Sequence, residues 1–353
     1  MKTTCSVDPC VREAKLWEAK DDGTALCRLC RHECRISEGK TGICGVRVCE
    51  GGALKTLVYG RLVAERPDPV EKKPLYHFLP GTLTHSLATV GCNLSCAHCQ
   101  NFSISQARGM SGKLPGSYTD PETLISNAIE AGAKSVSYTY TEPTVFMEYA
   151  LDVMALAHEK GLLNIFVTNG FMSLEALEAM DGLLDAANVD LKSMREETYR
   201  KLCGARLSPI LENIERLIGS GVWVEVTTLV IPGINDSDEE LGDAADFLKD
   251  MGETIPWHVT GFYPTFRLID RPPTPVGSLT RAREIGLAKG LRYVYQGNRP
   301  GSGGENTACH SCGRTVISRE GFALVENLIS RSGNCSFCGN TIPGRFGGEN
   351  GLQ

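Results

Sequence analysis

The chain has 353 residues, of which 42% are hydrophobic and 22% are charged, a composition typical of a globular protein with a substantial core. Thirty-six basic and 42 acidic side chains give a formal net charge of −6, which argues against nucleic-acid binding driven by bulk positive charge and leaves only a local basic groove open. Residues 1–22 lack the apolar segment of a signal peptide, and no run of about 18 apolar residues occurs. We therefore expect neither secretion nor a membrane partner.

Strand and helix patterns alternate between about residues 83 and 296. The predicted strands are, in chain order, 83–90, 135–140, 164–168, 188–191, 222–230, 257–262 and 293–295. The predicted helices are 121–131, 144–158, 173–180, two short helices that end near 221, then 238–251 and 279–291. This alternation favours right-handed βαβ units on a parallel sheet. The expected fold class is α/β, and six or seven such units favour a full or partial parallel barrel over a small open sheet.

The composition changes on both sides of this block. Residues 1–60 are cysteine-bearing and turn-rich, residues 298–308 are rich in Gly, Pro and Ser, and the last 45 residues bear cysteine again. We predict three modules: a cysteine-rich N-terminal module over 1–60, the barrel over 61–298, and a linker with a zinc-ribbon-like module over 299–353.

Cysteine is the most informative residue type. An odd number of cysteines, 15, in a chain this long argues against a disulfide framework. Eleven of them fall into three close groups: Cys27, Cys30, Cys34 and Cys44; Cys92, Cys96 and Cys99; and Cys309, Cys312, Cys335 and Cys338. Thiols grouped in this way are typical of metal ligands in a reducing compartment, so we expect a cytoplasmic protein.

Residues that perform chemistry in a parallel barrel follow the C-terminal ends of its strands. In this chain the candidates at the strand ends are Cys92, Cys96 and Cys99, then Glu142, Thr168, Asn169, Asp190, Lys192, Val230, Ile231 and His258. Because these ends meet at one rim of a barrel, we expect the side chains to converge there.

The spacing Cys92-x3-Cys96-x2-Cys99 supplies three thiolates and no obvious fourth ligand. A structural zinc site and an electron-transfer [4Fe–4S] cluster each take four protein ligands. Three cysteines on a [4Fe–4S] cluster leave one iron open to a small molecule. The alternatives are a zinc site completed by His98 or a distant residue, or three thiols on one helical face.

These cysteines and their neighbours resemble those of the radical S-adenosylmethionine (radical SAM) superfamily. The residues that carry the resemblance are the runs PLYHFLPG (74–81), TVGCNLSC (89–96) and CQN (99–101). They are similar to the pyruvate formate-lyase activating enzyme-like branch, and within it to the AmmeMemoRadiSam-system radical SAM enzyme. The core of the resemblance covers roughly residues 60–298, and it implies a partial (β/α)6-type parallel barrel for them.

The resemblance implies a radical SAM oxidoreductase with a [4Fe–4S] cluster on Cys92, Cys96 and Cys99. Reductive cleavage of S-adenosylmethionine would give a 5′-deoxyadenosyl radical that abstracts hydrogen from a substrate. The substrate would be a protein glycine, as for glycyl-radical activating enzymes, or else a small molecule or another target. A flavodoxin- or ferredoxin-like protein would donate the electron. No general acid or base is assigned, because the cofactor supplies the cleavage chemistry.

The resemblance also assigns cofactor contacts, and most of these residues have a structural alternative. Glu142 would accept the cofactor's amine, although Tyr140 and Thr141 replace the usual two glycines before it; alternatively, it is a helix N-terminal acid. Asp190 and Lys192 would lie near the cofactor, or form an ion pair. Thr168 and Asn169 would lie beside its carboxylate and ribose, or simply end a strand. Val230 and Ile231 would support adenine. His258 would contact the cofactor, or be a core histidine.

The two flanking cysteine groups each offer four thiols, enough for a closed site. Cys309-x2-Cys312-x22-Cys335-x2-Cys338 has the spacing of a zinc ribbon, so we favour zinc there over a cluster or unmetallated thiols. For Cys27, Cys30, Cys34 and Cys44 the spacing leaves zinc and an iron–sulfur cluster equally open. A non-catalytic protein with several such metal centres is the alternative to an enzyme.

Overall fold

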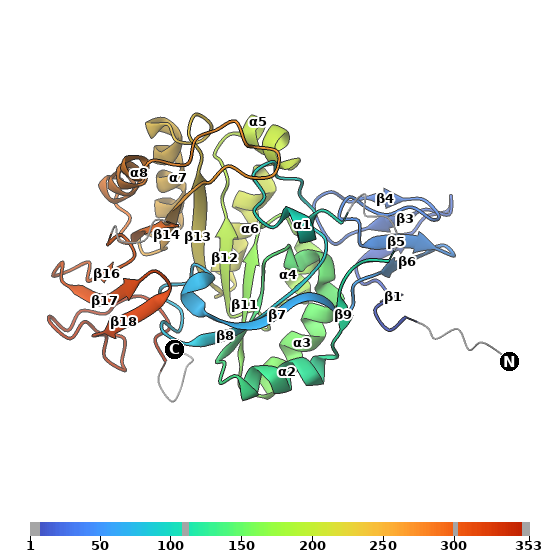
Figure 1. The fold of residues 1–353 in the computed structure, drawn as a ribbon, viewed down its shortest axis with the longest axis horizontal. Helices are drawn as coiled ribbons and strands as arrows, with labels where there is room; N and C mark the ends of the chain where they lie inside the picture. The colour runs from blue at the N-terminus through green and yellow to red at the C-terminus, as the bar shows by residue number, and fades with distance from the viewer. Residues whose placement is uncertain (1–7, 108–112, 299–302, 348–353) are drawn as a thin grey trace. The chain divides into compact units, whose positions relative to one another are not determined.

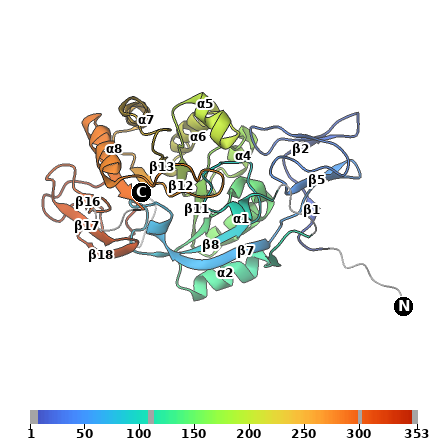
Figure 2. The ribbon, with the colours of Figure 1, turned by 45° about the horizontal axis from the view of Figure 1, so that its top comes forward.

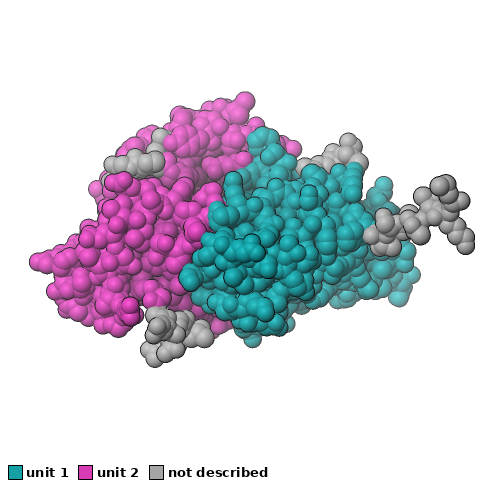
Figure 3. Space-filling view, turned by 60° about the horizontal axis from the view of Figure 1, so that its bottom comes forward, with its two compact units in different colours: residues 1–67, 85–95, 101–184 teal, residues 68–84, 96–100, 185–353 magenta. Residues whose placement is uncertain are grey.

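The computed structural model describes residues 8–107, 113–298 and 303–347, so the ends of the predicted outer modules and the start of the linker lie outside the described residues. The chain divides into two compact units (Figure 3). Unit 1 is Met1–Pro67, His85–Ser95 and Asn101–Leu184, and unit 2 is Asp68–Thr84, Cys96–Gln100 and Asp185–Gln353. The predicted middle module is thus shared between the units, and the division into three modules stays a prediction.

In unit 1, parallel strands alternate with helices. The strands of this part are β7 (Arg61–Pro69), β8 (Leu83–Thr89), β9 (Ser117–Tyr118), β10 (Ser135–Tyr138) and β11 (Leu163–Thr168), in the sheet order β11-β10-β8-β7-β9. β10 and β11 pair in parallel, and β7 and β9 antiparallel. The helices are α1 (Phe102–Ser105), α2 (Pro121–Glu130), the 3₁₀ helix η2 (Pro143–Phe146), α3 (Met147–Glu159) and α4 (Leu174–Ala179). α2 packs against α3, which covers β10 and β11 (Figure 1).

The N-terminal part of unit 1 consists of short strands. One sheet contains β1 (Arg12–Glu13), β6 (Ala53–Thr56) and β5 (Arg47–Glu50), and the other contains β2 (Trp17–Ala19), β3 (Ala25–Cys27) and β4 (Arg35–Ile36). All of these pairs are antiparallel. The strands are drawn in blue in Figure 1, and they hold the loops that carry the first cysteine group.

Unit 2 continues the alternation. Its parallel strands are β12 (Ala186–Asp190), β13 (Trp223–Val230), β14 (Trp257–Gly261) and β15 (Val294–Gly297). The helices are α5 (Glu196–Thr198), the π helix η3 (Tyr199–Cys203), α6 (Ser208–Gly219), α7 (Asp238–Met251) and α8 (Val276–Ala288), with a 3₁₀ turn, η1, at Val70–Lys72. α7 and α8 pack side by side, and α8 covers β14 and β15 (Figures 1 and 2).

The C-terminal part of unit 2 is an antiparallel sheet of β16 (Thr307–Ala308), β17 (Thr315–Glu320) and β18 (Ala323–Asn327). Cys309 and Cys335 share an apolar core with Tyr76, Tyr293 and Tyr295, so the cysteine-bearing segment packs directly on the strand–helix part of its unit. The predicted α/β fold is confirmed. None of the helices in the described residues is long and apolar enough to cross a membrane.

Candidate functional site

The loop of residues 91–100 carries the central cysteine group and follows β8 directly. Gly91 has φ +104°, and a Cβ there would lie 2.7 Å from Val46 Cγ1 and 3.1 Å from the Cys44 carbonyl oxygen, so only glycine fits without a shift of its neighbours. Residues 92–99 form no helix. The three thiols are therefore presented by a loop, and the alternative of one helical face is excluded.

Cys92 lies in a polar network of unit 1. Its Sγ accepts from the Leu94 backbone N–H at 3.3 Å and lies 3.7 Å from Asn169 Nδ2. The same Asn169 amide donates to Asn93 Oδ1 at 2.8 Å. The loop after β11 thereby contacts the first cysteine of the motif.

Glu142 is the centre of this network and is only 1% exposed. Its Oε1 accepts from the Thr144 N–H at 3.1 Å and from the hydroxyls of Thr144 and Thr168 at 2.6 and 2.8 Å. Its Oε2 accepts from the Asn169 N–H at 2.8 Å. Burial raises the pKa of Glu142, although these donors favour its charged form. Glu142 caps η2, as its structural alternative predicts, and also joins Thr168 and Asn169.

The backbone before Glu142 is unusual. Tyr140 has φ +63°, in the left-handed region that favours glycine, at the place where the resembling family has a glycine pair. Asn101 Nδ2 donates to the Tyr140 carbonyl at 2.7 Å, and Arg66 Nε donates to the Tyr140 hydroxyl at 3.0 Å. Tyr140 therefore adopts a backbone conformation that glycine favours, and hydrogen bonds to its carbonyl and its hydroxyl hold it there.

Cys96, in unit 2, lies in a cluster that the sequence did not predict. Ligand atoms of Cys96, His98 and Cys203 all lie within 4.8 Å of one another, and all three residues are buried. A hydrogen bond from Cys203 lowers the pKa of Cys96, and the positive charge of Lys192 lowers it further. Cys203 ends η3, far from the motif in sequence, and its spacing gives no signal of a role.

Asp190 and Lys192 form an ion pair with 2.8 Å between Lys192 Nζ and Asp190 Oδ2. Burial opposes the charge of Lys192, but Asp190, Cys96 and Cys203 together raise its pKa well above the ordinary value. Asn235 holds the backbone here, because its Nδ2 donates to the carbonyls of Lys192 and Leu229, both at 2.8 Å. The ion pair is real, and it also places a fixed positive charge near Cys96.

Val230 and Ile231 are fully buried at the end of β13. Ile231 forms an apolar cluster with Phe262 and Leu268, and Ala97 of the cysteine loop packs against it. This apolar cluster therefore adjoins the cysteine loop, and a contact of Val230 and Ile231 with the cofactor stays a prediction.

His258 does not lie with these residues. It is near the start of β14, three positions before the Gly261 that pairs with Val230. Its Nε2 lies 2.7 Å from Oε2 of the buried Glu225, and its ring contacts Tyr76 and Tyr295. The structure favours the alternative that His258 is a core histidine.

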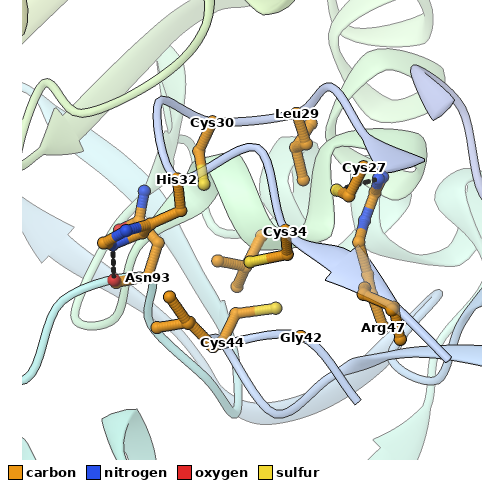
Figure 4. Close-up of a pocket in the computed structure, with 12 residues that line it drawn as sticks. Cys27, Leu29, Cys30, His32, Cys34, Gly42, Cys44, Arg47 and Asn93 are labelled. Carbon is orange, nitrogen blue, oxygen red and sulfur yellow. Dashed lines mark hydrogen bonds between the residues drawn. The ribbon is translucent and has the colours of Figure 1, made fainter. Parts of the chain in front are cut away.

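The flanking groups differ from each other. In the C-terminal group, Cys309 Sγ lies 3.7 Å from Cys338 Sγ and Cys312 Sγ lies 3.8 Å from Cys335 Sγ, and all four sulfurs are within 4.8 Å of one another. The four N-terminal thiols instead line a pocket (Figure 4).

Residues 86–248 match the family model described as "Radical SAM superfamily". The chain therefore contains a radical SAM domain. It is 41% identical over 334 residues to "Uncharacterized protein MJ0808" of Methanocaldococcus jannaschii, which covers 94% of this chain and 99% of that protein.

The chain is also similar to more distant proteins. The chain is 24% identical over 184 residues to the pyruvate formate-lyase 1-activating enzyme of Escherichia coli K12, covering 48% of this chain and 72% of that enzyme. A radical SAM methyltransferase structure from Sphaerobacter thermophilus aligns with a TM-score of 0.49 and 17% identity, over 63% of this chain and 68% of that one. The similarity to the pyruvate formate-lyase 1-activating enzyme supports the activating-enzyme-like branch.

A radical SAM domain implies a [4Fe–4S] cluster and S-adenosylmethionine, and the described residues fit both. Three thiols on one loop suit iron, because thiolates are the usual ligands of iron–sulfur clusters. Within unit 1 the Asn169 amide lies beside Cys92, and within unit 2 Lys192 interacts with Cys96 and an apolar cluster packs against Ala97, so each unit offers contacts that suit a nucleoside with an amino-acid group. The residues that sequence reasoning missed are Cys203 and Asn235.

Proposed function

We propose that this radical SAM protein binds its cluster through Cys92, Cys96 and Cys99 and S-adenosylmethionine at the iron that these residues leave free. When bound, these groups supply a 5′-deoxyadenosyl radical, which removes a hydrogen atom from the substrate. One observation carries the proposal: Asn169 and Lys192, which follow two other strands, each interact with a cysteine of the motif.

The side chains around the loop have separable roles in this proposal. Asn169 and Thr168, fixed by the buried Glu142, orient polar groups toward the cofactor's amino-acid end and ribose. Lys192, restrained by Asp190, contributes positive charge beside thiolates. Val230 and Ile231 exclude water and support the adenine. No side chain is required to move a proton.

The substrate class that we propose is a glycine of a partner protein. Two findings support it: the 24% identity to a pyruvate formate-lyase activating enzyme, and 31% identity over 108 residues to the benzylsuccinate synthase activating enzyme of Thauera aromatica. The PLYHFLPG run supports membership of the AmmeMemoRadiSam group. A flavodoxin- or ferredoxin-like electron donor and a cytoplasmic location complete the proposal.

We also propose zinc for the C-terminal group. Zn–S bonds of about 2.3 Å in a tetrahedron give sulfur–sulfur separations of about 3.8 Å. The separations of 3.7 and 3.8 Å match that value.

A second candidate, a closed non-catalytic metal site, is favoured by one observation, the convergence of Cys96, His98 and Cys203. The two candidates differ in whether S-adenosylmethionine is consumed. The protein, reconstituted anaerobically with iron and sulfide and reduced with dithionite, should convert S-adenosylmethionine to 5′-deoxyadenosine and methionine. Cys92→Ala should abolish the conversion. Absence of product from a sample with a reducible [4Fe–4S] cluster would overturn the proposal.

A further inference from the structure

The N-terminal cysteine group surrounds a pocket of unit 1 rather than a single point. Figure 4 shows the sulfurs of Cys30, Cys34 and Cys44 facing a common space, with Cys27 at its edge beside Arg47. The rest of the wall consists of apolar side chains, among them Leu29, Ile36 and Val145, and of the polar residues His32, Arg47 and Asn93.

The spacing of these sulfurs differs from that of the C-terminal group. Among the described residues, the C-terminal four are gathered within 4.8 Å of one another, but no three of the N-terminal four are. Four sulfurs around one zinc ion are about 3.8 Å apart. The sulfurs around a [4Fe–4S] cluster are further apart, because each binds a different iron and the Fe–S core lies between them. The wider group therefore suits a cluster.

The pocket also has a buried cation with an unused donor. Arg47 is 1% exposed, and its Nη1 donates to Cys27 Sγ at 3.4 Å. Nη2 of the same guanidinium pairs with Glu148. Arg47 Nε has no hydrogen-bond partner among the described residues, and neither has Oε2 of Glu148, whose carboxylate pairs with the same guanidinium. Arg47 therefore brings a buried positive charge to the wall of the pocket beside Cys27, where it would stabilise the thiolates of a bound cluster.

The pocket shares a wall with the Cys92 loop. Asn93, the residue after Cys92, lines the pocket, and His32 Nε2 lies 2.8 Å from the Asn93 carbonyl oxygen. The backbone of Cys44 approaches Gly91, where a Cβ would lie 3.1 Å from the Cys44 carbonyl oxygen. Within unit 1, Cys92 is therefore flanked by two residues, Gly91 and Asn93, that contact the N-terminal cysteine group or its pocket.

We propose that Cys27, Cys30, Cys34 and Cys44 bind a second [4Fe–4S] cluster, which passes electrons to the cluster on the Cys92 loop. This role rests on the proposed radical SAM function, whereas binding of the second cluster does not. The transfer moves one electron and no atoms. A one-electron donor of the flavodoxin or ferredoxin class is oxidised, the second cluster is reduced and then reoxidised, and the cluster on the Cys92 loop is reduced.

Binding is tested in the full chain without its central cysteines. A Cys92→Ala, Cys96→Ala, Cys99→Ala variant leaves the N-terminal pocket intact. After anaerobic reconstitution, iron and sulfide analysis should find one [4Fe–4S] cluster per chain, and the reduced sample should give an electron paramagnetic resonance (EPR) signal that S-adenosylmethionine does not alter. A variant that retains no iron and sulfide, or that holds zinc in the N-terminal group, would overturn the proposal.

The relay is tested with Cys30→Ser, Cys34→Ser. This variant should lose one cluster's iron but keep the EPR signal that responds to S-adenosylmethionine. With dithionite, the variant should form 5′-deoxyadenosine at the same rate as the unchanged protein. With reduced flavodoxin, it should form 5′-deoxyadenosine at least tenfold more slowly than the unchanged protein does. Cys49→Ser is the matched control, because Cys49 is a buried thiol of the same region outside the pocket. If the variant matches the rate of the unchanged protein with flavodoxin as well as with dithionite, the relay is refuted. If the unchanged protein does not cleave S-adenosylmethionine at all, the proposed function is refuted instead.

Discussion

Glu142 illustrates how one buried residue organises its surroundings. A carboxylate that is almost fully buried is unfavourable unless donors surround it, and here four donors from three residues do so. The sequence identified Glu142 by its place after a strand, and the resemblance identified it by its family position. Neither could predict that Thr168 and Asn169 would be its partners, because their contacts span 26 and 27 residues.

Glu142→Gln should therefore destabilise the protein. In glutamine an NH2 group replaces one of the two carboxylate oxygens. Either the Asn169 N–H or the threonine hydroxyls then lose their acceptor. The free energy of unfolding should fall by about 1–3 kcal/mol in urea titrations. Glu122→Gln, on the exposed face of α2, is the control and should change it by less than about 0.5 kcal/mol. Equal stability of the two variants would show that the network contributes little.

Cys203 tests whether the central cluster has an open iron. Because three thiolates suffice for a radical SAM cluster, Cys203→Ala should retain the cluster's iron after reconstitution. Cys96→Ala should lose it. Iron and sulfide analysis of the two variants makes the comparison, with the N-terminal group contributing equally to both. Loss of the cluster in both variants would identify Cys203 as a fourth ligand.

At the scale of elements, local signals predicted the strand–helix region well. α7 occupies the predicted residues because Ser237 caps it, accepting from the Glu240 N–H. Asp120 likewise caps α2 by accepting from the Thr123 N–H. α8 begins at Val276, three residues before its predicted start, because the chain enters the helix directly from Pro275 and tolerates Gly277 in the first turn. The short strands β1–β6 and β16–β18 were not predicted, because strands of 2–6 residues are too short to show a clear alternation of apolar and polar residues.

The PLYHFLPG segment carries the family resemblance, yet its contacts are structural. The backbone N–H groups of Tyr76 and His77 donate to Glu225 of β13 at 2.8–3.0 Å. His77 Nδ1 lies 2.6 Å from the Pro343 carbonyl oxygen and Nε2 lies 2.5 Å from the Tyr295 hydroxyl. A neutral ring satisfies both contacts, donating at Nδ1 and accepting at Nε2.

This segment should make the stability of the protein depend on pH. Burial lowers the pKa of His77 from 6.5 to about 4. Between these pH values the unfolded chain binds a proton that the folded chain does not, so the free energy of unfolding falls as the pH falls. The contribution of His77 over this window is at most about 3 kcal/mol.

His77→Gln should flatten this dependence relative to the unchanged protein, measured by denaturant unfolding from pH 7 to pH 4. His158→Gln, on α3, should retain it. An identical slope in His77→Gln and the unchanged protein would mean that His77 does not carry the effect.

At the scale of the whole molecule, the three cysteine groups could be located from the sequence, whereas the separations of their sulfurs could not be predicted. Spacing favoured a closed zinc site for the C-terminal group, where the structure brings the four sulfurs within 4.8 Å of one another. It left the N-terminal group open, because sulfur separation depends on how β3, β4 and β5 place the loops between them. His258 was placed at the rim by its strand, yet it lies near the start of that strand, where side chains face the buried core around Glu225.

Metal removal should expose the structural role of the C-terminal group. Cys309 and Cys335 belong to an apolar core of unit 2, so a zinc ion bound as proposed would cross-link that core, and its removal would break the cross-link. Cys312→Ser should lose one zinc per chain and make the segment after residue 303 sensitive to protease. Ser336→Ala, an exposed neighbour, should do neither. Resistance to protease in a zinc-free Cys312→Ser sample would contradict a structural role for the metal.

The central claim is that the cluster on the Cys92 loop has an iron that no protein atom occupies. EPR of the anaerobically reduced protein, recorded with and without S-adenosylmethionine, tests it most directly. If that iron is open, addition of S-adenosylmethionine changes the spectrum, and the change is absent in Cys92→Ala. An identical spectrum with and without S-adenosylmethionine, in a sample whose central cluster is reduced, would contradict the claim.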